Sequence, residues 1–388
     1  MKIDIYDPEQ YADGPPHEVF EQLRRTDPVH RQEMPDGTAY WAVMRHADVV
    51  EVSRHPNLFS ASKGGVVLED LEPDSLAMMQ DMLLAMDPPR HAEHRDSLSA
   101  HFRARVIAGL EPSIRAVCGR ILDDAGEGSV EVVHQVCSYV PSQVIGELVG
   151  IPDEDRMKIH TWAERIVSGE ADSFDGSVAM AMWAMELAAA RRDDPREDLV
   201  TLLLAAEFDG QPMTDLAFGS FFVQLVVAGN DTSRTLLSNA ILALLQHPDQ
   251  LAELRADRSL LPGAVEEVLR WDNPLHYFRR TASEDTVLAG TPIAEGDKLA
   301  MMYTSANRDE DVFDDPHRFD IHRNPNPHLS FGIGEHFCLG VHLARLEARI
   351  FLDEMLDRWS SIELAGVPER QHSNLNNSLV SLPLEVAR

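Results

Sequence analysis

The apolar and polar residues of this chain recur mainly with the period of an amphipathic helix. The most apolar stretch runs from Leu216 to Gly229, is interrupted by Gln224, and is typical of a core helix. We predict that this helix extends from Asp215 to Gln246, where the sequence His-Pro-Asp ends it. The same period predicts further helices over residues 17–25, 45–55, 90–106, 111–126, 139–150, 153–168, 175–192, 197–206, 260–271 and 338–359.

Strand patterns occupy less of the chain. Alternating runs on both sides of Pro35-Asp36-Gly37 predict a hairpin, residues 277–303 have strand character, and residues 376–386 predict a small C-terminal hairpin. Two long segments, 57–89 and 305–337, have no regular pattern. A loop as long as the first usually serves as a lid or a substrate wall.

The organisation that follows is simple. We find no internal repeat, low-complexity tract or flexible linker in the sequence. We therefore expect a single domain over residues 1–388, mainly α with a minor β region.

Composition narrows the possible partners. The chain has 34 basic and 65 acidic residues and a net charge of −31, which repels nucleic-acid phosphates and anionic lipid headgroups. No apolar run reaches the ~18 residues of a membrane helix, and the N-terminal residues lack the features of a signal peptide. The 3 cysteines argue against a disulfide framework and for a reducing compartment. We expect a soluble, cytoplasmic protein that binds neither nucleic acid nor membrane.

The third cysteine, Cys338, lies in a glycine-rich context, within the sequence HLSFGIGEHFCLG, directly before a predicted helix. The helix dipole and the free amides of a first turn favour negative charge, which predicts a lowered thiol pKa and a thiolate. A thiolate in an apolar, glycine-lined loop suits an axial ligand of haem iron. For an isolated cysteine a buried structural role is the commoner interpretation, and we assign Cys118 and Cys137 to it.

The spacing Phe331-x-x-Gly334-x-x-x-Cys338-x-Gly340 resembles the haem-binding loop of the cytochrome P450 family of haem-thiolate monooxygenases. The resemblance covers nearly the whole chain and implies the mainly α fold of that family, with haem b as cofactor. It implies that Cys338 is the axial ligand of the iron, and that the cofactor contacts Phe331, Gly332 and Gly340.

Two further motifs precede the cysteine loop in the same order along the chain as in this family. The pair Glu267 and Arg270 shares a helix face, and on bare sequence it is a solvated surface pair. The resemblance implies instead an inward-facing, structural pair. It would lock the coil before the cysteine loop, with Arg318 or His322 as the third partner.

The other motif is AGNDTSR, residues 228–234, inside the long apolar helix. The Thr232 hydroxyl can compete for a backbone carbonyl and kink the helix. The resemblance implies that the segment lies over the haem, with Ala228 against the cofactor. Thr232 would then bind dioxygen and Asp231 would relay protons. An ion pair of Asp231 with Arg234 is the alternative interpretation. Many members carry a second threonine where this chain has Ser233.

Haem propionates require cationic partners. The resemblance implies His91, Arg95, Arg280 and His336 in that role, and His94 and Arg279 are the neighbours most easily confused with them.

The implied reaction uses dioxygen and two externally supplied electrons to hydroxylate a C–H bond of a hydrophobic small molecule. The sequence looks closest to soluble actinobacterial-type members that oxidise sterols, terpenoids or branched lipids. The chain has no reductase motif, so a separate ferredoxin and its reductase are the expected partners of a monomer. A docking surface could include Arg103, Arg105, Arg345 and Arg349, although scattered solvated charge explains them almost as well.

The substrate pocket should be apolar. Its candidate walls are Met78, Met79, Met82, Val227, Leu275, His276, Leu379 and Val380. Two other function classes stay open at this point. One is a haem-thiolate enzyme of another reaction class, such as an isomerase, a dehydratase or a peroxygenase. The other is a haem-binding or ligand-binding protein without catalysis.

Overall fold

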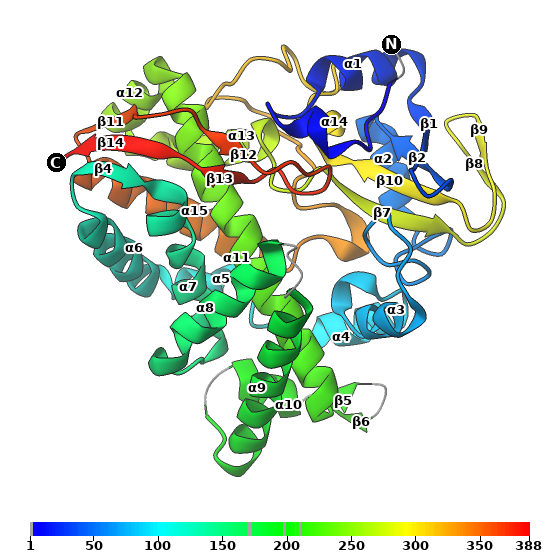
Figure 1. Ribbon diagram of the computed structural model, residues 1–388, viewed down its shortest axis with the longest axis horizontal. Coiled ribbons are helices and arrows are strands. Elements are labelled where there is room, and N and C mark those ends of the chain that lie inside the picture. The colour runs from blue at the N-terminus through cyan, green and yellow to red at the C-terminus, as the bar shows by residue number, and fades with distance from the viewer. Residues whose placement is uncertain (1–2, 169–172, 197–198, 206, 209–210) are drawn as a thin grey trace.

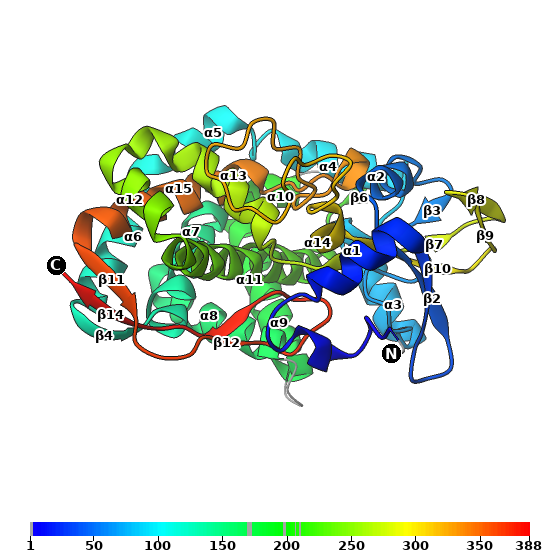
Figure 2. The same ribbon diagram turned by 90° about the horizontal axis from the view of Figure 1, so that it is seen from above.

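One long helix, α11 (Asp215–Gln246), crosses the molecule in both views, and many of the other helices pack against it (Figures 1 and 2). The computed structural model describes residues 3–168, 173–196, 199–205, 207–208 and 211–388. Thr214 caps α11, since its hydroxyl oxygen accepts a hydrogen bond from the amide of Ala217 at 3.2 Å. Nearly every residue of α11 after Asn230 is buried, which confirms the predicted core helix and its bounds.

Most of the other predicted helices are present. They are α1 (His17–Thr26), α2 (His46–Arg54), α6 (Glu111–Ala125), α7 (Tyr139–Val149), α8 (Asp153–Ser168), α9 (Ser173–Asp193), α10 (Leu199–Ala205), α13 (Leu261–Trp271) and α15 (Val341–Arg358). Two short helices, α12 (Pro248–Ala256) and α14 (Tyr303–Ala306), complete the helical part that faces the coil before Cys338.

Two helix predictions need correction. The helix predicted over residues 90–106 is divided into α4 (Arg90–Ser99) and α5 (Ala104–Ala108), because Arg103 takes an extended backbone conformation with ψ 145°. The last long helix begins at Val341 and not at Cys338, since Gly340 is its N-cap residue. Cys338 is therefore part of the preceding loop.

The segment 57–89 also holds more structure than its sequence predicts. It contains β3 (Phe59–Ser60), α3 (Pro73–Gln80) and the short 3₁₀ turn η2 (Leu83–Ala85). Gln224 of α11 accepts a hydrogen bond from the amide of Leu83 at 2.9 Å, which fastens this segment to the central helix. The polar interruption of the apolar stretch thus has a structural reason.

The main sheet of the minor β region lies on the side of the molecule that carries the N-terminus (Figure 1). This sheet has the order β1-β2-β10-β7-β3, in which β10 runs parallel to β2 and the other pairs are antiparallel. The strands are β1 (Val29–Glu33), β2 (Ala39–Val43), β7 (Tyr277–Ala282) and β10 (Lys298–Met302). The hairpin predicted around Pro35-Asp36-Gly37 joins β1 and β2 and is confirmed, and β8 (Thr286–Leu288) pairs with β9 (Thr291–Ile293) in a second hairpin.

The predicted C-terminal hairpin is wrong. Strand β13 (Leu379–Ser381) pairs with β12 (Glu369–Arg370), whereas β14 (Pro383–Ala387) pairs with β11 (Ser361–Leu364) and with β4 (Gly128–Glu131). Only Leu382 separates β13 from β14, which is too short for a two-residue hairpin turn. The last strands therefore tie the C-terminus to distant parts of the chain.

Glu267 and Arg270 of α13 form a fully buried ion pair with two hydrogen bonds, of 2.7 and 2.8 Å. The third partner is Arg323, whose guanidinium Nε lies 3.2 Å from the Glu267 carboxylate. Asn326 donates a further hydrogen bond to that carboxylate at 3.1 Å. The pair thus faces inward, and its carboxylate is bound to the coil that precedes the cysteine loop.

Both residues predicted as the third partner are corrected by this geometry. Arg318 contributes only its carbonyl, which accepts from Arg270 at 3.0 Å, and its own side chain is largely exposed. His322 instead pairs with Glu253 at 2.8 Å. The three basic side chains lie close together in sequence, and the path of the coil decides which one turns inward.

The first prediction concerns Arg323. We expect Arg323→Ala to lower the free energy of unfolding by about 2 kcal/mol, because it removes a charge-assisted hydrogen bond to a buried carboxylate. Urea unfolding followed by circular dichroism measures the change. Arg318→Ala is the matched control and should change stability by less than about 0.5 kcal/mol. Equal effects of the two substitutions would contradict the assignment.

Candidate active site

The loop that carries Cys338 is held in a tight conformation. The amide of Cys338 donates to the carbonyl of Phe331 at 2.8 Å, which closes the loop on itself. Gly332 and Gly334 have φ of +67° and +76°, a region that favours glycine. A Cβ atom at Gly334 would lie 2.7 Å from the carbonyl oxygen of Ser53, so only glycine lets the loop lie against α2. The two glycines therefore fix where the thiol stands.

The Cys338 thiol does not have the lowered pKa that the sequence predicts. Burial raises its pKa, while the amide of Gly340 and the charges of Arg95 and Arg345 lower it by less. The reason is that Cys338 precedes α15 by 3 residues in the sequence and is not part of its first turn. A bound metal ion, which ionises a coordinating thiol, would have to supply the missing stabilisation of the thiolate.

The AGNDTSR segment presents two different faces of α11. The Thr232 hydroxyl donates to the carbonyl of Ala228 at 2.6 Å, which is the competition for a backbone carbonyl that the sequence predicts. The helix itself runs without a break from Asp215 to Gln246. Ala228 is exposed and Thr232 partly exposed, one turn apart, whereas Asn230 and Asp231 between them are buried. An accessible alcohol thus lies beside a buried acid.

The acid is engaged in an ion pair. The Asp231 carboxylate binds the guanidinium of Arg234, and Arg234 also lies 3.9 Å from Glu164 of α8. Burial raises the pKa of Asp231, and the charge of Arg234 opposes this shift. The ion pair that was the alternative interpretation of this motif is therefore present.

Four basic side chains predicted to bind propionates come from three separate elements. His91 and Arg95 lie on α4, Arg280 on β7, and His336 in the cysteine loop. The rings of His91 and His336 are 4.3 Å apart between centroids, and the thiol of Cys338 acts electrostatically on Arg95. The fold thus brings these residues together next to the cysteine.

Little negative charge compensates this group: Asp87 acts electrostatically on His91 and Arg280, and Asp96 on Arg95. Burial and the charges of Arg95 and Arg280 lower the pKa of His91 to about 4 and that of His336 to about 2. The Nε2 atom of His336 is buried without a hydrogen-bond partner. Within the described part of the chain, neither Arg95 nor Arg280 forms an ion pair with a carboxylate, although Arg280 is only 5% exposed. A ligand with two carboxylates would fit these residues.

Gly340 fits a flat cofactor for a different reason. Its backbone angles, φ −81° and ψ 7°, are open to any residue, and a Cβ atom there would meet only the sulfur of Cys338, at 3.9 Å. The protein itself therefore leaves room for a side chain at this position. Glycine is needed only if another group approaches the loop closely.

The neighbour Arg279 has a different role from Arg280. It is buried, pairs with Asp70 at 3.0 Å, and donates to the carbonyls of residues 67–69. Lys298 of β10 binds the same carboxylate at 2.9 Å. These contacts anchor the segment 57–89 to the sheet. His94, the other neighbour, is buried in α4.

Sequence reasoning missed Asp87, which positions α4. Its carboxylate accepts from the amide of Ala61 at 2.8 Å and from the hydroxyls of Ser60 and Ser62. Its carbonyl accepts from the amide of His91 at 3.0 Å. The only signal in the sequence was an acid directly before Pro88-Pro89, ahead of a predicted helix.

The residues predicted as pocket walls have different environments. Met78 is 50% exposed on α3, Leu379 is buried in the main core and Val380 is 38% exposed. Met79, Met82, Val227 and Leu275 are half-buried.

His276 is a core residue, which corrects its assignment to the pocket. It is 1% exposed, its ring lies 4.8 Å from that of Tyr11, and its Nδ1 atom is 2.8 Å from the hydroxyl of Thr304. Burial lowers the pKa of His276 to about 3, so the imidazole is neutral.

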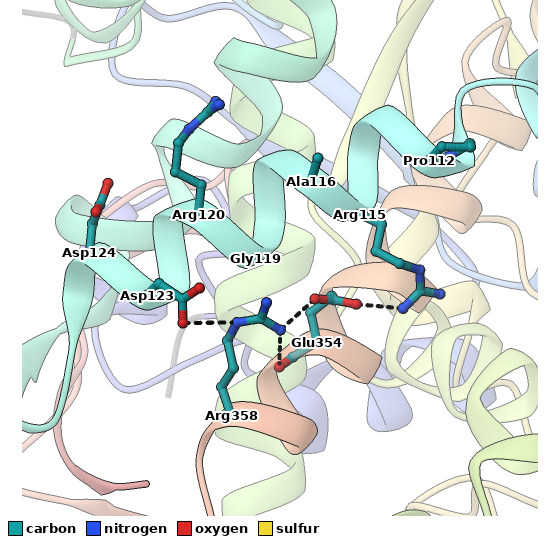
Figure 3. Close-up of a pocket in the computed structure, with 9 residues that line it drawn as sticks. All are labelled: Pro112, Arg115, Ala116, Gly119, Arg120, Asp123, Asp124, Glu354 and Arg358. Carbon is teal, nitrogen blue, oxygen red and sulfur yellow. Dashed lines mark hydrogen bonds and ion pairs between the residues drawn. The ribbon is translucent and has the colours of Figure 1, made fainter.

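A separate hollow lies between α6 and α15 (Figure 3). Glu354 stands in its wall and pairs with both Arg115 and Arg358, and Arg358 also pairs with Asp123 at 3.2 Å. Its paired side chains thus join two helices, in contrast to the group around His336, which forms no ion pair with a carboxylate among the described residues. We therefore place the candidate site at the cysteine loop.

Within the described part of the chain, no helix is long and apolar enough to cross a membrane, and no group of three or more His, Cys, Asp or Glu side chains could hold a metal ion. A metal at the cysteine loop would therefore have to come with a cofactor that supplies other ligands.

Comparison with known proteins agrees with this geometry. A steroid C26-monooxygenase of Mycolicibacterium smegmatis is 37% identical over 94% of this chain and 89% of its own length. A methyl-branched lipid omega-hydroxylase of Mycobacterium bovis is 36% identical over 94% of this chain and 90% of its own. The solved structure of Mycobacterium marinum cytochrome P450 CYP268A2 in complex with pseudoionone superposes with a TM-score of 0.92 at 36% identity, covering 99% of this chain and 98% of that one.

The family model described as Cytochrome P450 matches residues 156–386. This range includes residues 228–232 of α11, which we call the acid–alcohol turn, the buried Glu267 pair and the cysteine loop. With its fold and its full-length relatives, this chain belongs to the cytochrome P450 family, the haem-thiolate monooxygenases, and its cofactor is haem b.

Proposed function

We propose that this chain hydroxylates a C–H bond of a steroid, a terpenoid or a branched lipid, with electrons from a ferredoxin and its reductase. In the balanced reaction, the substrate R–H, dioxygen, two electrons and two protons give R–OH and water. The observation that carries the proposal is a basic group that forms no ion pair among the described residues, beside a glycine-rich cysteine loop, in a protein whose central helix keeps an acid and an alcohol together.

The cofactor would be held by residues from four elements. Cys338 would bind the haem iron through its thiolate, and His91, Arg95, Arg280 and His336 would bind the propionates. Phe331, Gly332, Gly340 and Ala228 are assigned to contacts with the porphyrin. When bound, haem b supplies the iron that binds dioxygen and the redox chemistry.

The chain itself controls proton delivery. Thr232 offers a hydroxyl on the accessible face of α11, with its hydrogen shared with the carbonyl of Ala228. Asp231 is buried behind it and paired with Arg234, whose other neighbour is Glu164, a 30% exposed residue of α8. We assign to Asp231 the relay of protons from this surface to the Thr232 hydroxyl, with Arg234 holding the carboxylate in place.

The substrate class rests on the relatives and on the composition of the wall. The relatives named above act on a steroid and on a methyl-branched lipid, and one binds pseudoionone. In this chain the segment around α3 and η2 carries several methionines, which adapt to irregular apolar ligands. Because Gln224 and Asp70 anchor this segment, its side chains can form a defined wall.

The electron donor would dock on α5, α13 and α15, near the cysteine loop. An apolar hollow there is lined by Ala104, Ile107, Ala108, Pro262, Val265 and Leu346. Arg345 pairs with Glu266 at 2.6 Å and Arg349 with Glu111 at 3.0 Å, so these two add less free positive charge than the sequence predicts. Arg103 and Arg105 are exposed beside the hollow and are the better docking residues.

We further propose that residues 1–388 form a single catalytic unit that acts as a cytoplasmic monomer. The unpaired cysteines support a reducing compartment. Gel filtration with light scattering tests the monomer, since a dimer at micromolar concentration would contradict it.

The proton-delivery assignment predicts the phenotype of Thr232→Ala. With a reconstituted ferredoxin system, we expect the yield of hydroxylated product per electron pair to fall about tenfold, because the hydroxyl that passes protons is lost. Product and NADH consumption are measured together. Thr26→Ala is a matched control, since Thr26 also donates to a carbonyl one turn back, that of Gln22 at 2.9 Å, but far from the site. An unchanged yield in Thr232→Ala would overturn the assignment.

The cofactor assignment predicts weaker haem retention in Arg280→Gln. Losing a charge-assisted bond to a propionate should speed haem transfer to excess apomyoglobin by about ten- to a hundredfold. The exposed Arg31→Gln serves as control. A transfer rate equal to the parent's would contradict the role of Arg280, and a reduced, carbon-monoxide-treated parent without the Soret band of a thiolate-ligated haem would contradict that of Cys338.

The docking assignment predicts slower electron transfer after charge reversal. We expect the double variant Arg103→Glu, Arg105→Glu to reduce the rate of the first electron transfer from ferredoxin about tenfold at low salt, with the difference shrinking at high salt. Stopped-flow reduction measures it, and the exposed Arg318→Glu is the control. A rate that does not change would remove the docking role.

A further inference from the structure

The helices α7 and α8 pack against the buried side of the acid–alcohol turn of α11. A hydroxyl of α7, Ser142, lies 2.7 Å from Oδ1 of Asn230 and 2.8 Å from Nδ1 of His160 on α8. All three side chains are buried. Asn230 directly precedes Asp231, so a polar chain from α8 ends at the residue next to the acid. The three helices lie side by side in Figure 1.

The same face of α11 is also clamped by close packing. A Cβ atom at Gly229 would lie 3.2 Å from Cδ1 of Ile145, one turn after Ser142 on α7. Ala228 and Thr232, on the other face, are accessible. The turn 228–232 is therefore fixed on its buried side by Ile145 and Ser142, while its opposite side is left for chemistry.

Counting hydrogens gives the polar chain a direction. Ser142 has one hydroxyl hydrogen, and its neighbours are Asn230 Oδ1, His160 Nδ1 and the carbonyl of Ser138 at 3.1 Å. If Asn230 presents its carbonyl oxygen, Ser142 must donate to it, and His160 must carry its proton on Nδ1 and donate to Ser142. If His160 carried its proton on Nε2, the amide of Asn230 would have to turn over. The tautomer of His160 and the orientation of Asn230 are thus linked.

Three charged groups and one ring surround His160. Glu164 lies one turn later on α8, Arg234 reaches it from α11, and Asp231 is bound to Arg234. The ring of Tyr139 on α7 stacks on the imidazole at 4.7 Å. Burial lowers the pKa of His160, Glu164 raises it and Arg234 lowers it. Because burial lowers the pKa of His160 from its ordinary value, the imidazole is neutral at pH 7.5 and has a defined tautomer.

We propose that His160 and Ser142 are positioning residues for the reaction: with its proton on Nδ1, His160 orients the Ser142 hydroxyl toward Asn230, and this bond holds the α11 turn that carries Asp231 and Thr232. Neither residue touches substrate or cofactor in this arrangement. The effect on catalysis rests on the proposed monooxygenase function, whereas the linked tautomer does not.

The first experiment reads the tautomer in the intact protein. Nitrogen-15 NMR of histidine-labelled holoenzyme at pH 7.5, with His160→Gln used for assignment, should show a protonated Nδ1 and an unprotonated Nε2. In Ser142→Ala this preference should be lost. A parent protein with its proton on Nε2 would overturn the proposal, whatever reaction the enzyme catalyses.

The second experiment separates positioning from stability. Ser142→Ala should lower the product yield per electron pair about tenfold through displacement of the turn, and Ser142→Thr, which keeps a hydroxyl, should restore most of it. Thr161→Ala is the control on α8, since its hydroxyl is bound to the carbonyl of Met157 and exposed. An equal melting temperature with unchanged yield in Ser142→Ala would contradict the proposal. Absence of product in the parent itself would instead count against the proposed function.

The third experiment adds a negative charge at residue 230 and measures the titration of His160. Asn230→Asp keeps the acceptor, and so the Nδ1–H tautomer, but adds a negative charge that raises the pKa of His160. Its imidazole should therefore become protonated at a higher pH than in the parent, and the NMR titration midpoint should move upward. A midpoint that stays in place would show that Asn230 does not face this network.

Discussion

A fully buried carboxylate, that of Glu267, joins the helical part of the molecule to the coil that ends at Cys338. Burying a charge is costly unless every oxygen is satisfied, and here Arg270, Arg323, Asn326 and the amide of Asp320 all bind it. Each partner other than Arg270 lies in the coil. If the coil left this path, the buried carboxylate of Glu267 would lose its partners and remain as an uncompensated charge. This cost holds the irregular coil in one conformation.

The same coil is then fastened to α13 at a second point, close to the cysteine loop. The hydroxyl of Ser330 donates to the carbonyl of Leu269 at 2.6 Å and accepts from the side chain of Asn307, whose carbonyl oxygen binds the amide of Leu329. From Leu329 the loop turns through Gly332 and Gly334 onto α2. The position of a single sulfur atom thus depends on a chain of polar contacts that begins at a buried ion pair.

Electrostatics gives the site its selectivity. The protein as a whole has a charge of −31, yet the group of His91, Arg95, Arg280 and His336 is basic and without ion pairs in the described part of the chain. The acidic surface repels most anions, and the basic group, of which His91 and Arg280 are buried, stabilises an anion that has an apolar body. A flat cofactor with two carboxylates meets both conditions. One face of α11 packs against Ser142 and Ile145 of α7, and the opposite face, with Ala228 and Thr232, is accessible.

The sequence by itself determined most of the long helices, the β1–β2 hairpin and the short motifs around Cys338 and Thr232, because each depends on neighbours in the chain: the helical period, turn glycines and residue spacing. It did not determine which basic residue of the coil completes the Glu267 network, that His276 belongs to the core, or that burial raises the pKa of Cys338. Nor did it join β14 to β4 or His160 to Asn230. These are contacts between segments far apart in the chain, and their energies depend on burial and on the direction of side chains, which only the packed tertiary structure decides.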